Sequence, residues 1–294
     1  MILKKHFFLT FLVFCPMVYA DDTLPSPGNL PGPYAFLGIH GPADDAAIVD
    51  KIVLDVFGDY TRDNFGGDTY ALRYSIEVPF GDSASIMLEH LYETWSLPSE
   101  VAQDLGISDS GSNLGDFAVR GKFLFIRESD RVPAMSLKLV VKAPAGSDEN
   151  ARYMDTTAVL LSVLGAKNFH STSQSLVTNL RLITELGIAA WDDSDQAQND
   201  ALKWGIATLL QLGKPHRVRI GAYGLVGRRD NGDRPSVAQI EWEYGVNETA
   251  RAFIGAEAGL NEDADDYSIE AGLRFRFNSI LPWGSPGHSP TLAR

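Results

Sequence analysis

The sequence predicts an all-β protein: a transmembrane, antiparallel, up-and-down β-barrel of about twelve strands. Three observations predict this fold. The chain starts like an exported protein, many segments place an apolar residue at every second position, and the connections between these segments alternate between long polar loops and tight turns. Outer-membrane barrels combine these features, because their strands face lipid and lumen alternately and their turns are short on the periplasmic side.

Residues 1–20 form the predicted signal peptide. Lys4 and Lys5 precede a short apolar run over residues 7–18, and Ala20 ends a stretch suited to cleavage. Cys15 is the only cysteine, so the exported chain is expected to have neither a disulfide nor a thiolate metal site. The net formal charge of −13 argues against nucleic acid as a partner, because phosphate binding needs an excess of Lys and Arg.

Residues 21–48 precede the first predicted strand and are rich in Pro and Gly. Proline has no N–H to donate to a strand ladder, so this segment is not a central strand. Two interpretations stay open. The segment is either a periplasmic linker or a plug that enters the lumen, with Phe36, Leu37 and Ile39 against the wall.

Residues 49–277 form the predicted barrel. In residues 267–277, for example, every second side chain is apolar, and Glu270, Arg274 and Arg276 lie between them. Similar alternation recurs along the chain and predicts strands that start near residues 49, 69, 84, 115, 134, 154, 175, 200, 216, 236, 249 and 266.

A soluble β-sandwich would show the same alternation, with its apolar face inside. The alternating connection lengths favour a barrel instead. Aromatic residues near predicted strand ends, such as Tyr70, Trp242 and Phe277, also favour it, because aromatic girdles mark membrane interfaces. The predicted location is therefore the bacterial outer membrane, with lipid and lipopolysaccharide as partners.

Two kinds of outer loop stand out. In residues 96–106, Ser96, Pro98 and Gly106 suit the cap, first turn and end of a short helix, in a loop placed to cover the barrel mouth. Residues 192–200 and 261–266 are acidic, but they lack the glycine and distal glutamate of a helix-loop-helix calcium site. No metal or other cofactor is predicted.

The polar faces of the predicted strands carry charges of both signs. Inside a barrel they form either a structural salt-bridge network or a constriction that selects ions and solutes by charge. The lumen candidates are Arg73, Glu77, Arg120, Lys122, Lys138, Lys142, Arg181, Glu185, Glu241, Glu243, Arg274 and Arg276. Arg217, Arg219 and Glu270 share the same face.

A barrel-wall lipid hydrolase is the catalytic alternative. His170 has Ser171 and Ser173 nearby, as a Ser–His pair requires, but it falls in a predicted periplasmic turn, far from outer-leaflet lipid. His90 has no serine at a suggestive spacing, and no G-x-S-x-G motif is present. The sequence therefore favours a protein that is not an enzyme.

Near the chain end, "EAGLRFRF" resembles the C-terminal assembly signal of outer-membrane β-barrels. Glu270, Gly272, Phe275 and Phe277 occupy the places of that signal. The resemblance implies recognition by the barrel-assembly machinery. In that class the strand usually ends the chain, whereas residues 278–294 follow here as a predicted periplasmic tail.

A second resemblance spans most of the exported chain. Segments 115–125 and 133–150 resemble a family of Gram-negative outer-membrane proteins that is similar to the transporter-like barrels encoded with phenol meta-cleavage pathways. The matching residues are Gly115, Asp116, Lys122, Pro133, Ala134, Lys142, Pro144, Gly146 and Asp155.

This second resemblance implies an outer-membrane barrel and a narrow passive channel or transporter for small solutes, hydrophobic ones among them. A fold analogy does not fix function, so a closed barrel that maintains the envelope is the alternative.

Overall fold

A computed structural model describes residues 42–63, 66–105, 108–143, 157–170, 177–192, 198–213, 215–227, 235–261 and 264–278. Within these residues the protein is all-β, with one short helix, α1 (Ser99–Leu105). The strands are β1 (Ile52–Arg62), β2 (Asp68–Phe80), β3 (Ala84–Ser96), β4 (Ser110–Ile126), β5 (Ala134–Ala143), β6 (Ala158–His170), β7 (Asn179–Asp192), β8 (Gln198–Leu212), β9 (His216–Gly227), β10 (Ser236–Gly245), β11 (Ala250–Gly259) and β12 (Tyr267–Phe277).

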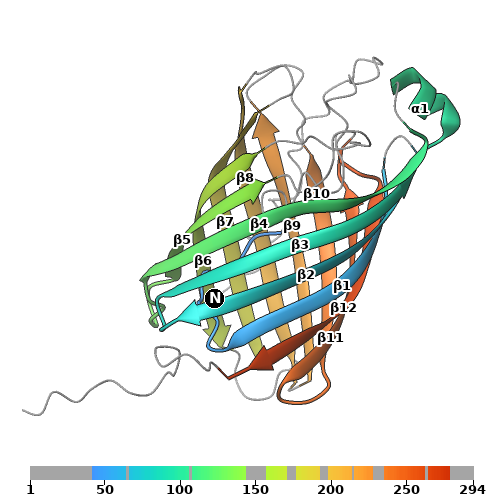
Figure 1. Cartoon of the computed structure of the whole chain (residues 1–294). Coiled ribbons are helices and arrows are strands. Elements are labelled where there is room, and N and C mark those ends of the chain that lie inside the picture. The colour runs from blue at the N-terminus through green and yellow to red at the C-terminus, as the bar shows by residue number, and fades with distance from the viewer. Residues whose placement is uncertain are drawn as a thin grey trace, which may run out of the picture.

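The strands close into a barrel in which each pairs antiparallel with its neighbours in sequence (Figure 1). Closure is made by β1 and β12, whose register joins Ile52 to Phe277 and Arg62 to Tyr267. An up-and-down barrel leaves no open sheet edge, which is the condition for a sheet to cross a membrane. The predicted fold class is confirmed.

The two faces of the wall differ as a membrane barrel requires. Large apolar side chains point outward, such as Leu72 (49% exposed) and Ile188 (63% exposed), while Lys138 and Glu185 are buried inside at 1% and 3% exposure. A soluble β-protein would place these residues the other way round. The outer apolar band is stable only in hydrocarbon, so the orientation fits a bilayer.

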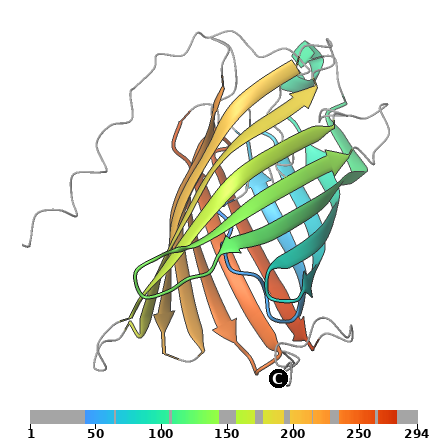
Figure 2. The ribbon, with the colours of Figure 1, turned by 90° about the vertical axis from the view of Figure 1, so that its left-hand side faces the viewer.

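The two rims also differ. Figure 1 shows α1 at the upper rim and the β10–β11 turn at the lower rim, where β1 begins and β12 ends. At the lower rim, Gly81 and Gly213 adopt positive φ angles of 67° and 72°, which only glycine adopts without strain. Figure 2 views the same barrel from the side and shows the strong tilt of β4 to β8.

The predicted helix in residues 96–106 is confirmed as α1, although the helix begins at Ser99 rather than next to Ser96. Whether its loop covers the mouth stays a prediction. The described residues contain no helix long and apolar enough to cross a membrane. The predicted signal peptide, residues 21–41 with the proposed plug residues Phe36, Leu37 and Ile39, and the end of the tail, residues 279–294, lie outside the described residues.

Candidate functional site

The barrel interior is the candidate site, and its first component is the chain that precedes β1. Residues 42–50 lie within the barrel (Figure 1), where Ala43 and Ala46 are 1% and 0% exposed. Ala43 packs on Ile183 and Ala207, and Ala46 packs on Ala134, Leu164 and Ala166. We call residues 42–50 the inner segment.

Ion pairs fix the inner segment to the wall. Asp44 pairs with Arg120, and Asp45 receives two hydrogen bonds from Arg181, at 2.6 and 2.7 Å. Ser136 donates to the carbonyl oxygen of Ala46. Two charged side chains and a backbone carbonyl are thus satisfied by wall residues on β4, β5 and β7.

The charge state of Asp44 follows from these contacts. Burial raises the pKa of this carboxyl, but the positive charges of Arg120, Lys122, Lys138 and Arg219 together lower it below its usual range. Asp44 is therefore ionised, and it binds the wall as an anion.

A buried charge cluster lies beside the inner segment. Glu185 on β7 accepts from Lys138 at 2.6 Å and from Ser162 at 2.8 Å, and Lys203 is 3.7 Å away. The amide N–H of Asp44 donates to the other oxygen of Glu185 at 3.2 Å. The cluster fills the lumen between β5 and β8, since Lys138 and Lys203 are each 1% exposed.

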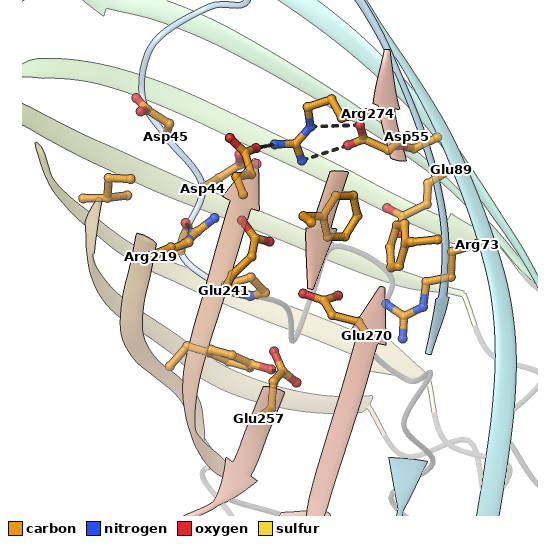
Figure 3. A pocket seen from close by; sticks show the side chains of 18 of the residues that line it. Asp44, Asp45, Asp55, Arg73, Glu89, Arg219, Glu241, Glu257, Glu270 and Arg274 are labelled. Carbon is orange, nitrogen blue, oxygen red and sulfur yellow. Dashed lines mark hydrogen bonds and ion pairs between the residues drawn. The ribbon is translucent and has the colours of Figure 1, made fainter. Parts of the chain in front are cut away.

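The opposite wall carries a second set of ion pairs. Arg274 on β12 binds Asp55 of β1 at 2.9 and 3.0 Å (Figure 3), and it also pairs with Glu243. Arg73 pairs with Asp59 at 2.8 Å. Each arginine also lies 5.6 Å over a ring, Arg73 over Phe57 and Arg274 over Phe253.

The described residues line two cavities inside the barrel. The first, of about 620 Å³, is lined by the inner segment and by side chains of β1 to β5 and β7 to β12. The second, also about 620 Å³, lies toward the lower rim and includes Asp82, Glu128 and Asn168. Asp45, Ala47, Ile48, Leu209 and Arg217 line both. The inner segment therefore lies between the two cavities.

Glu128 lines the second cavity and is held in place by two hydrogen bonds. It accepts from the backbone amide of Asn168 at 2.7 Å and from Arg181 at 2.7 Å. Burial raises the pKa of Glu128, but these two hydrogen bonds and the positive charges of Arg181 and Lys167 lower it overall.

All twelve predicted lumen candidates lie on the inner face. Nine of them line the first cavity: Arg73, Glu77, Arg120, Lys122, Lys138, Glu241, Glu243, Arg274 and Arg276. Arg181 lines the second cavity, and Glu185 and Lys142 are buried in the wall. Their role in selecting solutes stays a prediction. Sequence reasoning missed Asp44, Asp45, Asp55, Asp59, Lys203, Arg251 and Glu257, which line or pair within the same lumen.

Of the predicted assembly signal, Phe275 and Phe277 stack with ring centroids 6.4 Å apart, and Phe277 is 49% exposed on the outer wall. Glu270 and Gly272 alternate with them and lie on the lumen side. Recognition of this strand by the assembly machinery stays a prediction.

The catalytic candidates do not form a Ser–His pair in the described part of the chain. His90 contacts Tyr74, whose hydroxyl lies 3.0 Å from Nδ1. His170 ends β6, and residues 171–176, with both candidate serines, lie outside the described residues. Within the described residues, no group of three or more His, Cys, Asp or Glu side chains is arranged to hold a metal ion.

Fold and lumen together define an outer-membrane β-barrel with a charged, cavity-containing interior. Over residues 52–277, from the first strand to the last, the chain matches the family described as "Putative MetA-pathway of phenol degradation". The chain belongs to this family, and the predicted resemblance to phenol-pathway barrels is confirmed. No curated protein matches it significantly.

Two solved structures show the same fold. An outer membrane channel from Pseudomonas putida F1 superposes with a TM-score of 0.61 at 10% identity, covering 82% of this chain and 98% of that chain. The NanC porin gives a TM-score of 0.53 at 11% identity, covering 76% of this chain and 98% of that chain. At these identities the likeness concerns the fold alone.

Proposed function

We propose that the protein is a narrow passive channel for small solutes in the outer membrane. The observation that carries this proposal is the open space inside the barrel. One cavity of about 620 Å³ lies on each side of the inner segment, whereas side chains would fill the interior of a purely structural barrel.

Three features support small solutes of mixed polarity. Charged residues of both signs line the first cavity, and the rings of Phe57 and Phe253 line it too. The inner segment and Arg217 border both cavities, so a solute that moves from one cavity to the other would pass beside Arg217. The family description names phenol degradation, so small aromatic compounds are the first class to test.

A closed barrel with a structural role in the envelope is the second candidate. The inner segment favours it, because Asp44 and Asp45 bind the wall through ion pairs and Ala46 is fully buried. A segment held this firmly would keep the lumen shut unless a solute or a change in conditions released it.

Conductance of the refolded protein in planar bilayers distinguishes the channel from the closed barrel. A channel should give discrete current steps, and Arg217→Gln should change the step size or the ion preference because it removes a charge from the passage. Arg131→Gln is the matched control, since Arg131 is exposed on the lower-rim turn between β4 and β5. A silent bilayer with correctly folded barrels would contradict channel function and favour the closed barrel.

A further inference from the structure

Arginines of β9, β11 and β12 gather around one carboxylate at the lower-rim end of the first cavity. Glu243 on β10 is 4% exposed, and the Nη1 atoms of Arg217 and Arg251 lie 3.5 and 3.2 Å from its Oε2. Arg274 pairs with Oε1 of the same carboxylate and is also bound to Asp55. Two carboxylates therefore serve three guanidinium groups, and one positive charge is left over. We call Arg217, Arg251 and Arg274 the arginine cluster.

The remaining charges at this end of the cavity do not remove the excess. Arg276 on β12 pairs with Asp50 of the inner segment. Glu241 faces Arg219 in the register of β9 and β10, and Arg219 donates to the carbonyl oxygen of Ala43. The other two carboxylates of the inner segment are paired with arginines of β4 and β7. The excess therefore persists when every carboxylate is ionised, and it grows if one of them binds a proton.

The other carboxylates of β11 and β12 lie farther from the lower rim. Glu257 stands six residues beyond Arg251, and Glu270 stands four residues before Arg274. The rise of a strand places them roughly 20 and 13 Å away along the backbone. Figure 3 shows Glu257 and Glu270 apart from Arg274. Because salt largely screens exposed charges more than about 10 Å apart, these carboxylates do not neutralise the arginine cluster.

The backbone pairing brings two of these arginines together. Arg251 and Arg274 are direct partners in the register of β11 and β12. Like charges that face each other across a sheet destabilise it. Departures from favourable local pairing are expected at functional sites. A bound anion would relieve this repulsion, so the pairing is a second observation that points to an anionic ligand.

Arg217 has hydrogen-bond donors available to a solute. Its side chain is 34% exposed, and it lines both cavities. Within the described residues, its guanidinium donates from Nε to Oε1 of Gln211 at 2.9 Å and forms the longer contact with Glu243. A guanidinium has further N–H donors in a planar fork that matches the two oxygens of a carboxylate. Arg217 can therefore bind a carboxylate without losing its present partners.

The surroundings of Arg217 suit an organic anion. Ile48 of the inner segment and Leu209 of β8 line both cavities together with Arg217. The ring of Phe253 lies beneath Arg274, with the guanidinium carbon 5.6 Å from the ring centroid. A ligand that carries one carboxylate and a small apolar body would contact both the arginines and these apolar side chains.

We propose that Arg217, Arg251 and Arg274 form a binding subsite for small carboxylates with an apolar body. The importance of this subsite for transport rests on the proposed channel function, but binding itself does not. The carboxylate accepts hydrogen bonds from Arg217 and balances the excess charge of the arginine cluster, while the apolar body packs on Ile48 and Leu209.

Calorimetric titration of the refolded protein in detergent at pH 7 tests binding directly. Benzoate, which is ionised at this pH, should bind, while benzyl alcohol and benzylamine, which match its ring, should bind at least roughly tenfold more weakly. Arg217→Gln should weaken benzoate by at least roughly tenfold, because it removes a charged donor. Arg73→Gln is the matched variant. Arg73 lines the same cavity from β2 but pairs with Asp59, so its loss should change benzoate affinity by no more than about twofold.

Heat-modifiability on gels shows whether each variant folds, and the ligand series on the unmodified protein needs no variant. Benzoate binding no tighter than benzyl alcohol, or unchanged by Arg217→Gln, would overturn the subsite. Equal weakening by Arg217→Gln and Arg73→Gln would also overturn it, because the charge of the whole cavity would then bind the anion. A silent bilayer with intact benzoate binding would overturn the channel alone. Conduction without benzoate binding would overturn the subsite alone.

Discussion

Replacing one glycine of the barrel wall by a larger residue should release the inner segment from the wall. Gly205 on β8 faces Ala43, and a Cβ on Gly205 would lie 2.9 Å from the Cβ and 3.3 Å from the Cα and N of Ala43. Because the contacted atoms of Ala43 include backbone atoms, a small side-chain rotation cannot relieve this clash. Gly205→Val adds two further methyl groups, and overpacking of this kind costs about 1–3 kcal/mol.

That cost acts on the equilibrium between docked and undocked segment, if the barrel wall itself stays closed. At about 1.4 kcal/mol per tenfold, the docked-to-undocked ratio should fall by roughly 5- to 150-fold. Gly205→Ala, which adds the Cβ alone, should lie between the unmodified protein and Gly205→Val.

Two readouts should change together. A cysteine placed at Ala46, which is 0% exposed, should react with a water-soluble maleimide faster when the segment undocks. The only natural cysteine, Cys15, lies in the predicted signal peptide and should not interfere. Single-channel conductance should rise in parallel. Gly121→Val is the control, because a Cβ there would meet nothing within 4 Å.

If the folded Gly205→Val variant showed an unchanged rate of maleimide labelling at position 46, the contact between Gly205 and Ala43 would not hold the inner segment in place. Faster labelling with unchanged conductance would refute the reasoning that the segment restricts the lumen.

Three further predictions follow from the same contacts. Glu185→Gln should destabilise the barrel by about 3–5 kcal/mol, because it removes the carboxylate beside Lys203 and leaves Lys138 only Asp44, 3.8 Å away; urea unfolding in detergent would measure this. Phe277→Ser should lower the fraction of barrel assembled in cells but not the folding yield in detergent, if the last strand is an assembly signal; equal loss in both would contradict that role. The pKa of Asp44 is depressed in the docked state, so docking should be constant above about pH 5 and weaken as the pH falls below about 4. Conductance should rise over that acidic range, and Asp44→Asn should remove the pH dependence.

The strands could be predicted from the sequence because lipid and lumen impose opposite polarity on alternate residues. Predicted starts at 84, 134, 216 and 236 agree with the structure, and those at 69, 249 and 266 each differ by one residue. The largest error concerns β4, which begins at Ser110 rather than 115. Residues 110–114 lack alternation, and a register shift between His90 and Tyr92 interrupts the pairing there.

The site could be predicted only in part. Alternation identified which charges face the lumen, as for Arg181 and Glu185, since it needs only the local pattern. The alternating pattern could not identify the partners of these charges. Asp45, for example, lies 136 residues from Arg181, in a segment without any periodic pattern. Glu257 was not predicted as a lumen residue because its neighbours on β11 are mostly small residues, which give a weak alternating pattern.

The lumen divides into a filled half and an open half, and the division suggests where a solute would travel. Between β4 and β8, Glu185, the buried lysines and the inner segment fill the middle of the lumen, and the second cavity lies beside them toward the lower rim. Between β9 and β2, the first cavity stays open. We infer that solutes pass along the β9–β12 wall, and that the inner segment sets the width of that path from the opposite side.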